Sequence, residues 1–309
     1  MGQTWTFPTP NDAGLAVRFS RWRSRWQQGG IEDYALRAAK AQRSVWASDA
    51  RIEISEQRIW LNGLPNSFSG LRIVQLSDIH HGKFYPLEAA ARAVALANAL
   101  QPDLVALTGD FVSYSRACVE PVAEVLGMLR ARYGVLAVLG NHDFRVSADG
   151  ITRALDRQGI EVLRNRHVRL CFRGEELALA GVDDHGYGAD LRRAMSGIPS
   201  RSPKILLAHN PQIIRAAARY GADLVLSGHT HGGQLNFPVI GSFAYGRSPE
   251  RLRYKIGWDR LADTQIYVSR GLGTIVLPWR LRCPAEIPHI ELLPSLTGDS
   301  PGAASRAAN

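Results

Sequence analysis

Five short apolar runs, each followed at once by polar residues, constrain the fold of this chain more than any other feature of its sequence. The runs cover residues 71–76, 103–107, 134–139, 204–208 and 222–226. Ala- and Leu-containing segments with helical spacing lie between them, as in 87–100 and 119–130. Buried strands that alternate with helices in this way indicate an α/β core.

Each of these runs leads into side chains that bind metal ions through oxygen or imidazole nitrogen. They are Asp78 and His80, Asp110, Asn141 and His142, His209, and His229 and His231. Because ligands collect beyond the carboxyl ends of strands in open α/β sheets, we expect these side chains to meet at one edge. A single junction could be a turn, a helix cap or a core histidine. Five such junctions in one chain favour a built site.

The types of donor atom narrow the choice of metal. Carboxylate, amide and imidazole ligands without thiolates suit manganese, iron, zinc or nickel rather than a cysteine-bound structural zinc. A carboxylate that bridges two ions holds them about 3.5–4 Å apart, which is the spacing used in phosphoryl chemistry. The pattern therefore predicts two divalent metal ions and a hydrolytic reaction.

The remaining segments complete the predicted architecture. Residues 167–182 are typical of a hairpin, and 265–269 and 287–292 of closing strands. We therefore expect an α/β sandwich, in which two mixed β-sheets pack face to face and helices flank them. A helix is predicted over 148–158, and a Gly-, Pro- and Arg-rich loop over 237–263.

The folded domain is predicted to span residues 51–295. A basic N-terminal extension over residues 1–50 precedes it, and a disordered tail of small and polar residues over 296–309 follows it.

The charge of the chain favours anionic partners. It has 37 Lys and Arg against 28 Asp and Glu, a formal net charge of +9, which suits phosphorylated substrates, nucleic acid or acidic lipid. No basic stripe with interleaved aromatic residues occurs outside 18–26, so nucleic acid is the less expected partner. Four basic residues after the last histidine motif would guide an anionic substrate or form a solvated run of charge: Arg247, Arg251, Arg253 and Lys255.

Cysteine content and hydropathy suggest a location. The three cysteines are far apart, so we expect no disulfide framework and a reducing compartment. There is no apolar run long enough to span a bilayer, and the first 30 residues lack the apolar centre of a secretory signal. We therefore expect a cytoplasmic protein.

An amphipathic helix is predicted near the N-terminus. Leu15, Phe19, Trp22 and Trp26 fall on one stripe of it, with arginines on the other faces. This stripe would either lie on the inner face of the membrane or pack on the protein's own core.

The combined motifs resemble those of the calcineurin-like metallophosphoesterase family. The matching set is Asp78-x-His80, Gly109-Asp110, Gly140-Asn141-His142-Asp143, His209 and Gly228-His229-Thr230-His231. The resemblance covers roughly residues 71–292, and no motif position of the family is missing. Residues 232–234, 270–273 and 282–287 further resemble a bacterial phosphodiesterase subgroup that includes UDP-2,3-diacylglucosamine hydrolases of lipid A synthesis.

The resemblance implies a role for each matching residue. Two metal ions would share seven ligands: Asp78, His80 and His231 on the first, Asn141, His209 and His229 on the second, and Asp110 between them.

Three residues beside these ligands have other implied roles. His142 would bind no metal but would face the phosphate, donating a proton to the leaving oxygen or stabilising charge in the transition state. Asp143 would cap the following helix or orient His142, with the cap favoured. His81 would lie on the rim of the site.

The expected activity is hydrolysis of a phosphodiester or pyrophosphate bond in a membrane lipid or a nucleotide-linked substrate. A nuclease or a cyclic-nucleotide phosphodiesterase is the alternative enzyme. A non-catalytic interaction scaffold is a third reading, but relatives of that kind typically lose metal ligands or the site histidine, and here all are present. No obligate protein partner is expected.

Overall fold

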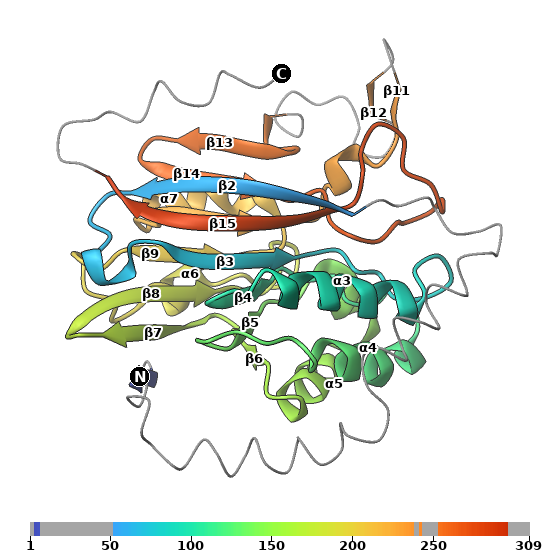
Figure 1. The fold of residues 1–309 in the computed structure, drawn as a ribbon, viewed down its shortest axis with the longest axis horizontal. Coiled ribbons are helices and arrows are strands. Elements are labelled where there is room, and N and C mark those ends of the chain that lie inside the picture. The colour runs from blue at the N-terminus through green and yellow to red at the C-terminus, as the bar shows by residue number, and fades with distance from the viewer. Residues whose placement is uncertain (1–2, 7–51, 238–240, 243–252, 296–309) are drawn as a thin grey trace.

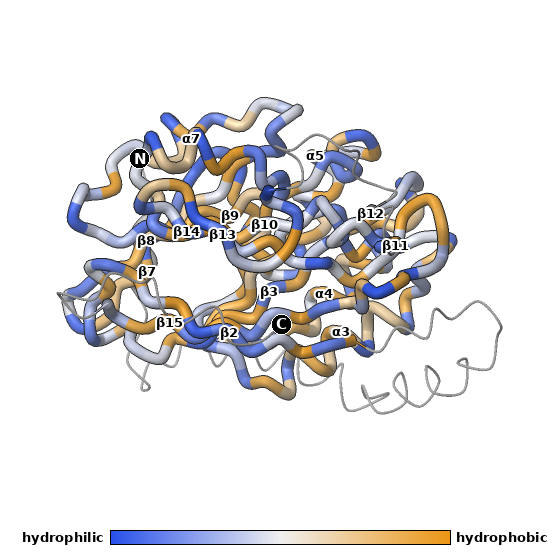
Figure 2. Tube along the Cα trace, turned by 90° about the horizontal axis from the view of Figure 1, so that it is seen from above, coloured by the Kyte–Doolittle hydropathy of each residue, from blue (hydrophilic) through white to orange (hydrophobic). Residues whose placement is uncertain are grey.

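The computed structural model describes residues 3–6, 52–237, 241–242 and 253–295. Two mixed β-sheets pack face to face, and helices cover their outer faces (Figure 1). Figure 2 shows the layers from above, with α7 (Ile214–Arg219) outside one sheet and α3 (Leu87–Ala99) outside the other. The predicted sandwich is therefore confirmed.

The first sheet has six strands in the order β2-β15-β3-β4-β5-β6. Their bounds are β2 Glu53–Leu61, β3 Leu71–Leu76, β4 Leu104–Leu107, β5 Val135–Ala137, β6 Glu161–Val162 and β15 Glu286–Pro294. Strands β3 to β6 are parallel, and β15 runs antiparallel to β3 and parallel to β2. Helix α3 covers this sheet together with α4 (Val119–Leu126) and α5 (Asn141–Arg157).

The second sheet has seven strands in the order β1-β7-β8-β9-β10-β14-β13. Their bounds are β1 Gln3–Thr6, β7 Arg166–Phe172, β8 Glu175–Gly181, β9 Lys204–Leu207, β10 Leu224–Ser227, β13 Gly257–Leu261 and β14 Thr264–Val268. Helices α6 (Leu191–Met195) and α7 cover its outer face. The antiparallel ribbon of β11 (Asn236–Phe237) and β12 (Gly241–Ser242) stands apart from both sheets.

The core follows from the alternation of side chains along each strand. In β3, Ile73 faces the second sheet, whereas Val74 and Leu76 face the helices. Gln75 is buried and links the sheets at one edge, because its amide donates to Thr108 Oγ1 and to the carbonyl of Ser227, both at 2.9 Å. Apolar burial thus stacks the layers, and this polar contact joins the end of β10 to that of β4.

Two sequence predictions about single elements are wrong in their bounds. The helix predicted over 148–158 begins at Asn141, with one interruption at Ser147 (φ 179°, ψ 92°), so Asn141 and His142 lie in its first turn. The loop predicted over 237–263 contains β13, which pairs with β14 and packs Trp258 on Tyr267, with ring centroids 4.8 Å apart. The hairpin and both closing strands are confirmed as β7–β8, β14 and β15.

Among the residues that the structure describes, there is no helix whose length and apolar character would let it cross a bilayer. Several predictions lie outside the described residues and stay predictions: the amphipathic helix over 15–26, the tail over 296–309, Arg247 and Arg251.

Candidate metal centre

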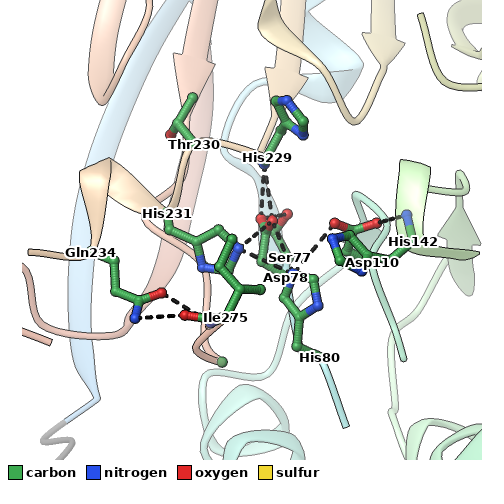
Figure 3. Close-up of polar contacts among 12 residues, drawn as sticks. Ser77, Asp78, His80, Asp110, His142, His229, Thr230, His231, Gln234 and Ile275 are labelled. Carbon is green, nitrogen blue, oxygen red and sulfur yellow. Dashed lines mark hydrogen bonds and ion pairs between the residues drawn. The ribbon is translucent and has the colours of Figure 1, made fainter. Parts of the chain in front are cut away.

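The turns that follow β3, β4, β9 and β10 meet at one edge of the sandwich, together with the first turn of α5. The structure brings the predicted acidic and imidazole ligands into groups whose donor atoms lie within 4.8 Å of one another. In Figure 3, Asp78, His80 and Asp110 lie between His231 on one side and His142 on the other. The predicted convergence at the carboxyl ends of the strands is therefore confirmed.

The first group consists of Asp78, His80 and His231, which are all buried. Asp78 Oδ1 lies 3.3 Å from His231 Nε2 and 4.0 Å from His80 Nε2. The two imidazole Nε2 atoms are 3.1 Å apart. Three donor atoms thus face a common point, as the ligands of one ion do.

The second group consists of Asp110, His209 and His229. Asp110 Oδ2 lies 3.2 Å from His209 Nε2, and His209 Nε2 lies 3.2 Å from His229 Nδ1. The same Asp110 oxygen is also 3.3 Å from His80 Nε2 of the first group. Asp110 therefore stands between the two groups, which is the position of a bridging carboxylate.

The partners of the individual donor atoms fit a pair of cations. His209 Nδ1 donates to the carbonyl of Thr108 at 2.8 Å, so its Nε2 is left to face Asp110. Asn141 Oδ1 is buried and has no hydrogen-bond partner in the described structure. Because buried polar atoms are nearly always paired, an unpaired amide oxygen beside these groups is explained by a metal ion.

The backbone at this edge is strained. Five of the predicted ligands have left-handed φ values: 52° at Asp78, 50° at His80, 56° at Asp110, 71° at His229 and 52° at His231. Each such conformation costs a non-glycine residue of order 1–3 kcal/mol and persists only where the surroundings fix it. Strain of this kind clusters at functional sites.

Two glycines of the motifs allow the close approach of neighbouring turns. A methyl group on Gly140 would overlap the carboxylate of Asp110, and one on Gly228 would overlap Ser77 and Asp78. The glycines that precede Asn141 and His229 are thus packing requirements of the site.

Electrostatics at the site keep both carboxylates charged. Burial alone would raise the pKa of Asp110, but the charges and hydrogen bonds of His209 and His80 outweigh burial and hold it well below 3.8. The pKa of Asp78 is also lowered, since His231 and His209 outweigh its burial. Anionic carboxylates are the form that binds metal.

The imidazoles divide into two kinds. Burial lowers the pKa of His231 to about 3 and that of His229 to about 4, so both rings are neutral, as metal binding requires. His209 is the exception, because the charge and hydrogen bond of Asp110 outweigh burial and raise its pKa to about 10. A proton on His209 is one that a metal ion would displace.

His142 lies beside these ligands and has contacts of its own. Its Nδ1 donates to the carbonyl of Ser113 at 2.9 Å, and its backbone N–H donates to Asp110 Oδ1 at 2.8 Å. Burial lowers its pKa below 6.5. Its Nε2 is therefore available toward His80, whose ring meets that of His142 edge-on at 4.7 Å. It also forms a group with His80 and Asp110, in which the donor atoms lie within 4.8 Å of one another.

Asp143 caps α5, as the sequence favoured, and it also supports the site. Its carboxylate accepts the backbone N–H groups of Gly140, Asp110 and Phe111 at 2.8–2.9 Å. Burial and the charge of Asp110 raise its pKa to about 7. His81 lies on the rim, where its Nδ1 donates to the carbonyl of Tyr85 at 3.0 Å.

Two supporting residues received no role from the sequence. The Gln234 amide donates to the carbonyls of Ile275, Leu277 and Trp279 at 2.8–3.0 Å. The Arg280 guanidinium donates to Gly273 O at 2.6 Å and reaches the carbonyl oxygen of His231 at 3.4 Å. Only the position of Gln234 directly after the histidine motif could have drawn attention to it, since nothing in a sequence shows which carbonyls an amide meets.

The predicted substrate-binding residues are only partly described. Arg253 contacts Asp259 (3.5 Å) and the carbonyl of Arg260 (3.2 Å), which are residues of β13 rather than of the metal groups. Lys255 lies nearer the centre, because its carbonyl accepts a hydrogen bond from Thr230 Oγ1 at 2.6 Å.

Comparison with known proteins supports the reading of these motifs. Residues 71–233 match the family model described as calcineurin-like phosphoesterase. The chain is 36% identical over 256 residues to the "Transmembrane protein with metallophosphoesterase domain" of Danio rerio, covering 78% of this chain and 57% of that protein. It is 33% identical over 246 residues to the "Uncharacterized metallophosphoesterase YkuE" of Bacillus subtilis, covering 76% of this chain and 84% of that protein. It is also 33% identical over 227 residues to the "Phosphodiesterase YaeI" of Escherichia coli, covering 72% and 82%.

Proposed function

Because this chain belongs to the calcineurin-like phosphoesterase family, we propose that it hydrolyses phosphodiester or pyrophosphate bonds with two divalent metal ions. The observation that carries this proposal is the position of Asp110, whose Oδ2 lies 3.2–3.3 Å from imidazoles of both ligand groups. The similarity to a protein named phosphodiesterase supports a diester substrate.

In this proposal each of the two ligand groups holds one metal ion. Asp78, His80 and His231 hold one ion, Asn141, His209 and His229 hold the other, and Asp110 bridges them. Such a pair of ions, when bound, polarises the phosphoryl oxygens and lowers the pKa of water. Manganese, iron, zinc and nickel all suit this set of donor atoms.

His142 acts on the substrate rather than on a metal. The Ser113 carbonyl fixes the proton on Nδ1, so Nε2 is the ring atom left to exchange a proton with the substrate. Burial lowers the pKa of the ring, which favours its neutral form. Positioned imidazoles of this kind transfer protons or stabilise charge at the leaving oxygen.

The substrate that we favour is a membrane-lipid or nucleotide-linked phosphate. The net charge of +9 and the resemblance to the subgroup with UDP-2,3-diacylglucosamine hydrolases support this choice. Nucleic acid and cyclic nucleotides are alternatives. Peripheral contact of residues 15–26 with the inner face of the membrane belongs to the same proposal.

A hydrolysis panel tests the proposed activity. The full chain is loaded with Mn²⁺, Fe²⁺, Zn²⁺ or Ni²⁺ and assayed on bis-p-nitrophenyl phosphate, UDP-diacylglucosamine and cyclic nucleotides. We expect diester hydrolysis that Asp110→Ala reduces by orders of magnitude and His81→Ala leaves nearly unchanged. Equal activity of Asp110→Ala and the parent would remove the two-metal mechanism. Metal binding without hydrolysis of any phosphate would favour the scaffold reading.

A further inference from the structure

One rim of the metal centre exposes bulky apolar side chains. Ile256, Val276, Trp279 and Leu281 are exposed by 47%, 70%, 57% and 39%, and we call these four residues the apolar rim. They are four of the nine large hydrophobic side chains exposed among the described residues. Three of them lie in the connection from β14 to β15, which carries an orange, hydrophobic stretch beside β11 and β12 in Figure 2.

The structure ties this rim to the metal centre. Gln234, three residues after His231, binds Ile275 through both ends of its amide, as Figure 3 shows. Leu281 is paired with Leu235 across an isolated bridge. Ile256 lies beside Gly232, since its Cδ1 would be 3.3 Å from a methyl group on that glycine. The rim is therefore a fixed border of the site.

The backbone holds the most exposed of these side chains outward at a cost. Val276 has φ 61°, a left-handed conformation that is a clear outlier for a β-branched residue. The Gln234 amide fixes the residues on both sides of Val276, because it donates to the carbonyls of Ile275 and Leu277 at 3.0 and 2.8 Å. A strained loop that keeps Val276 and Trp279 in contact with water is typical of a binding surface.

Charge around the rim identifies the kind of partner. Arg282 is exposed and follows Leu281 directly, and Lys255 precedes Ile256 but is half-buried, with its Nζ donating to Asn236 Oδ1 at 2.8 Å. Tryptophan and aliphatic side chains next to basic ones are the composition that binds lipid headgroup regions, and a net charge of +9 favours an anionic surface.

We propose that the apolar rim inserts into the headgroup region of an anionic phospholipid bilayer, so that the metal centre borders the membrane surface. This contact is distinct from the one predicted for residues 15–26. It does not depend on the reaction that the centre catalyses, and its test measures no hydrolysis.

Vesicle co-sedimentation of the full chain tests this proposal. Vesicles of phosphatidylcholine, with and without phosphatidylglycerol, are compared for the parent and the double variant Val276→Ser/Trp279→Ser. We expect the parent to favour phosphatidylglycerol vesicles and the variant to bind them about tenfold or more weakly, since two apolar side chains leave the interface. The matched control is Trp60→Ser, because Trp60 is 39% exposed and belongs to β2, whose C-terminal end lies on the opposite side of the molecule from β11 and β12 in Figure 1. It should bind as the parent does.

Two further variants keep the outcome decisive. Val276→Gly removes the side chain and accepts the left-handed backbone, so it should fold normally and still bind vesicles more weakly. The variant Trp22→Ser/Trp26→Ser measures how much of the vesicle binding comes from the N-terminal segment. Parent-like binding by Val276→Gly and by the double rim variant would overturn the proposal. The proposal would also be overturned if the parent bound neither kind of vesicle. Self-association of the parent through the rim, seen by light scattering without vesicle binding, would overturn it as well.

Discussion

The carboxylate of Asp143 accepts the backbone N–H of Asp110 at 2.8 Å, so the residue that caps α5 also fixes the loop of the bridging ligand. Because a second oxygen of Asp143 accepts from Phe111 at 2.9 Å, an amide in its place would turn an N–H group toward a backbone donor. We therefore expect Asp143→Asn to lower metal affinity or kcat/KM by about 10–100-fold. Calorimetric titration with Mn²⁺ and diester kinetics measure both.

The control for this variant is Asp190→Asn, which makes the same chemical change at the cap of α6. Asp190 accepts from the backbone of Arg193 at 2.9 Å and belongs to none of the ligand groups. Parent-like metal affinity and kinetics are expected for it. If Asp143→Asn also matches the parent, the support that we assign to Asp143 is wrong.

His142 should contribute to turnover without holding metal. Replacement by alanine removes the imidazole that Ser113 orients, and the loss of general acid catalysis reduces kcat by roughly 10²–10⁴-fold. Elemental analysis should show the same metal content as the parent. Loss of one bound ion in His142→Ala would instead make this residue a ligand.

Gln234 should be important for stability. Its two amide N–H groups are shared among three carbonyls of the strained connection between β14 and β15 and its oxygen accepts one N–H from it, and leucine would leave these backbone groups without their partners. We expect Gln234→Leu to lower the free energy of unfolding of the metal-free protein by about 2 kcal/mol or more. Urea denaturation measures the change, with exposed Gln212→Leu as a control that should stay within about 0.5 kcal/mol. Equal effects of the two substitutions would contradict this role.

Metal binding should stabilise the fold. Because a metal that binds the folded chain and not the unfolded one shifts the equilibrium toward the folded state, a metal at a hundred times its Kd adds about 2.7 kcal/mol to the free energy of unfolding. Thermal unfolding with chelator and then with excess Mn²⁺ should show a rise in Tm of several degrees in the parent and a smaller one in Asp110→Ala. An unchanged Tm in the parent would count against metal binding at this centre.

The sandwich and the positions of the predicted ligands could be anticipated because the signals for both lie in short stretches of sequence. A buried strand is a short apolar run, and Asp78, Asp110 and His209 each follow such a run within three residues. The start of α5 was missed because Gly140-Asn141-His142-Asp143 contains turn formers, whereas the cap contacts of Asp143 allow the helix to begin there.

Other parts of the site depend on contacts between distant segments. Gln234 and Arg280 bind backbone carbonyls, which have the same chemistry at every residue, so no sequence pattern reveals their partners. Strand β13 was hidden because its stability comes from pairing with β14 and from Trp258, which donates to Gln57 at 2.6 Å.

The number of metal ions bound per chain tests the central claim most directly. The full chain is saturated with Mn²⁺, freed of excess metal by gel filtration and analysed for its elements, beside Asp110→Ala and the rim control His81→Ala. Two ions per chain are predicted for the parent and for His81→Ala, and at most one for Asp110→Ala, because Asp110 lies within 3.3 Å of imidazoles from both groups. A parent that binds one ion or none, or an Asp110→Ala variant that still binds two, would contradict the account.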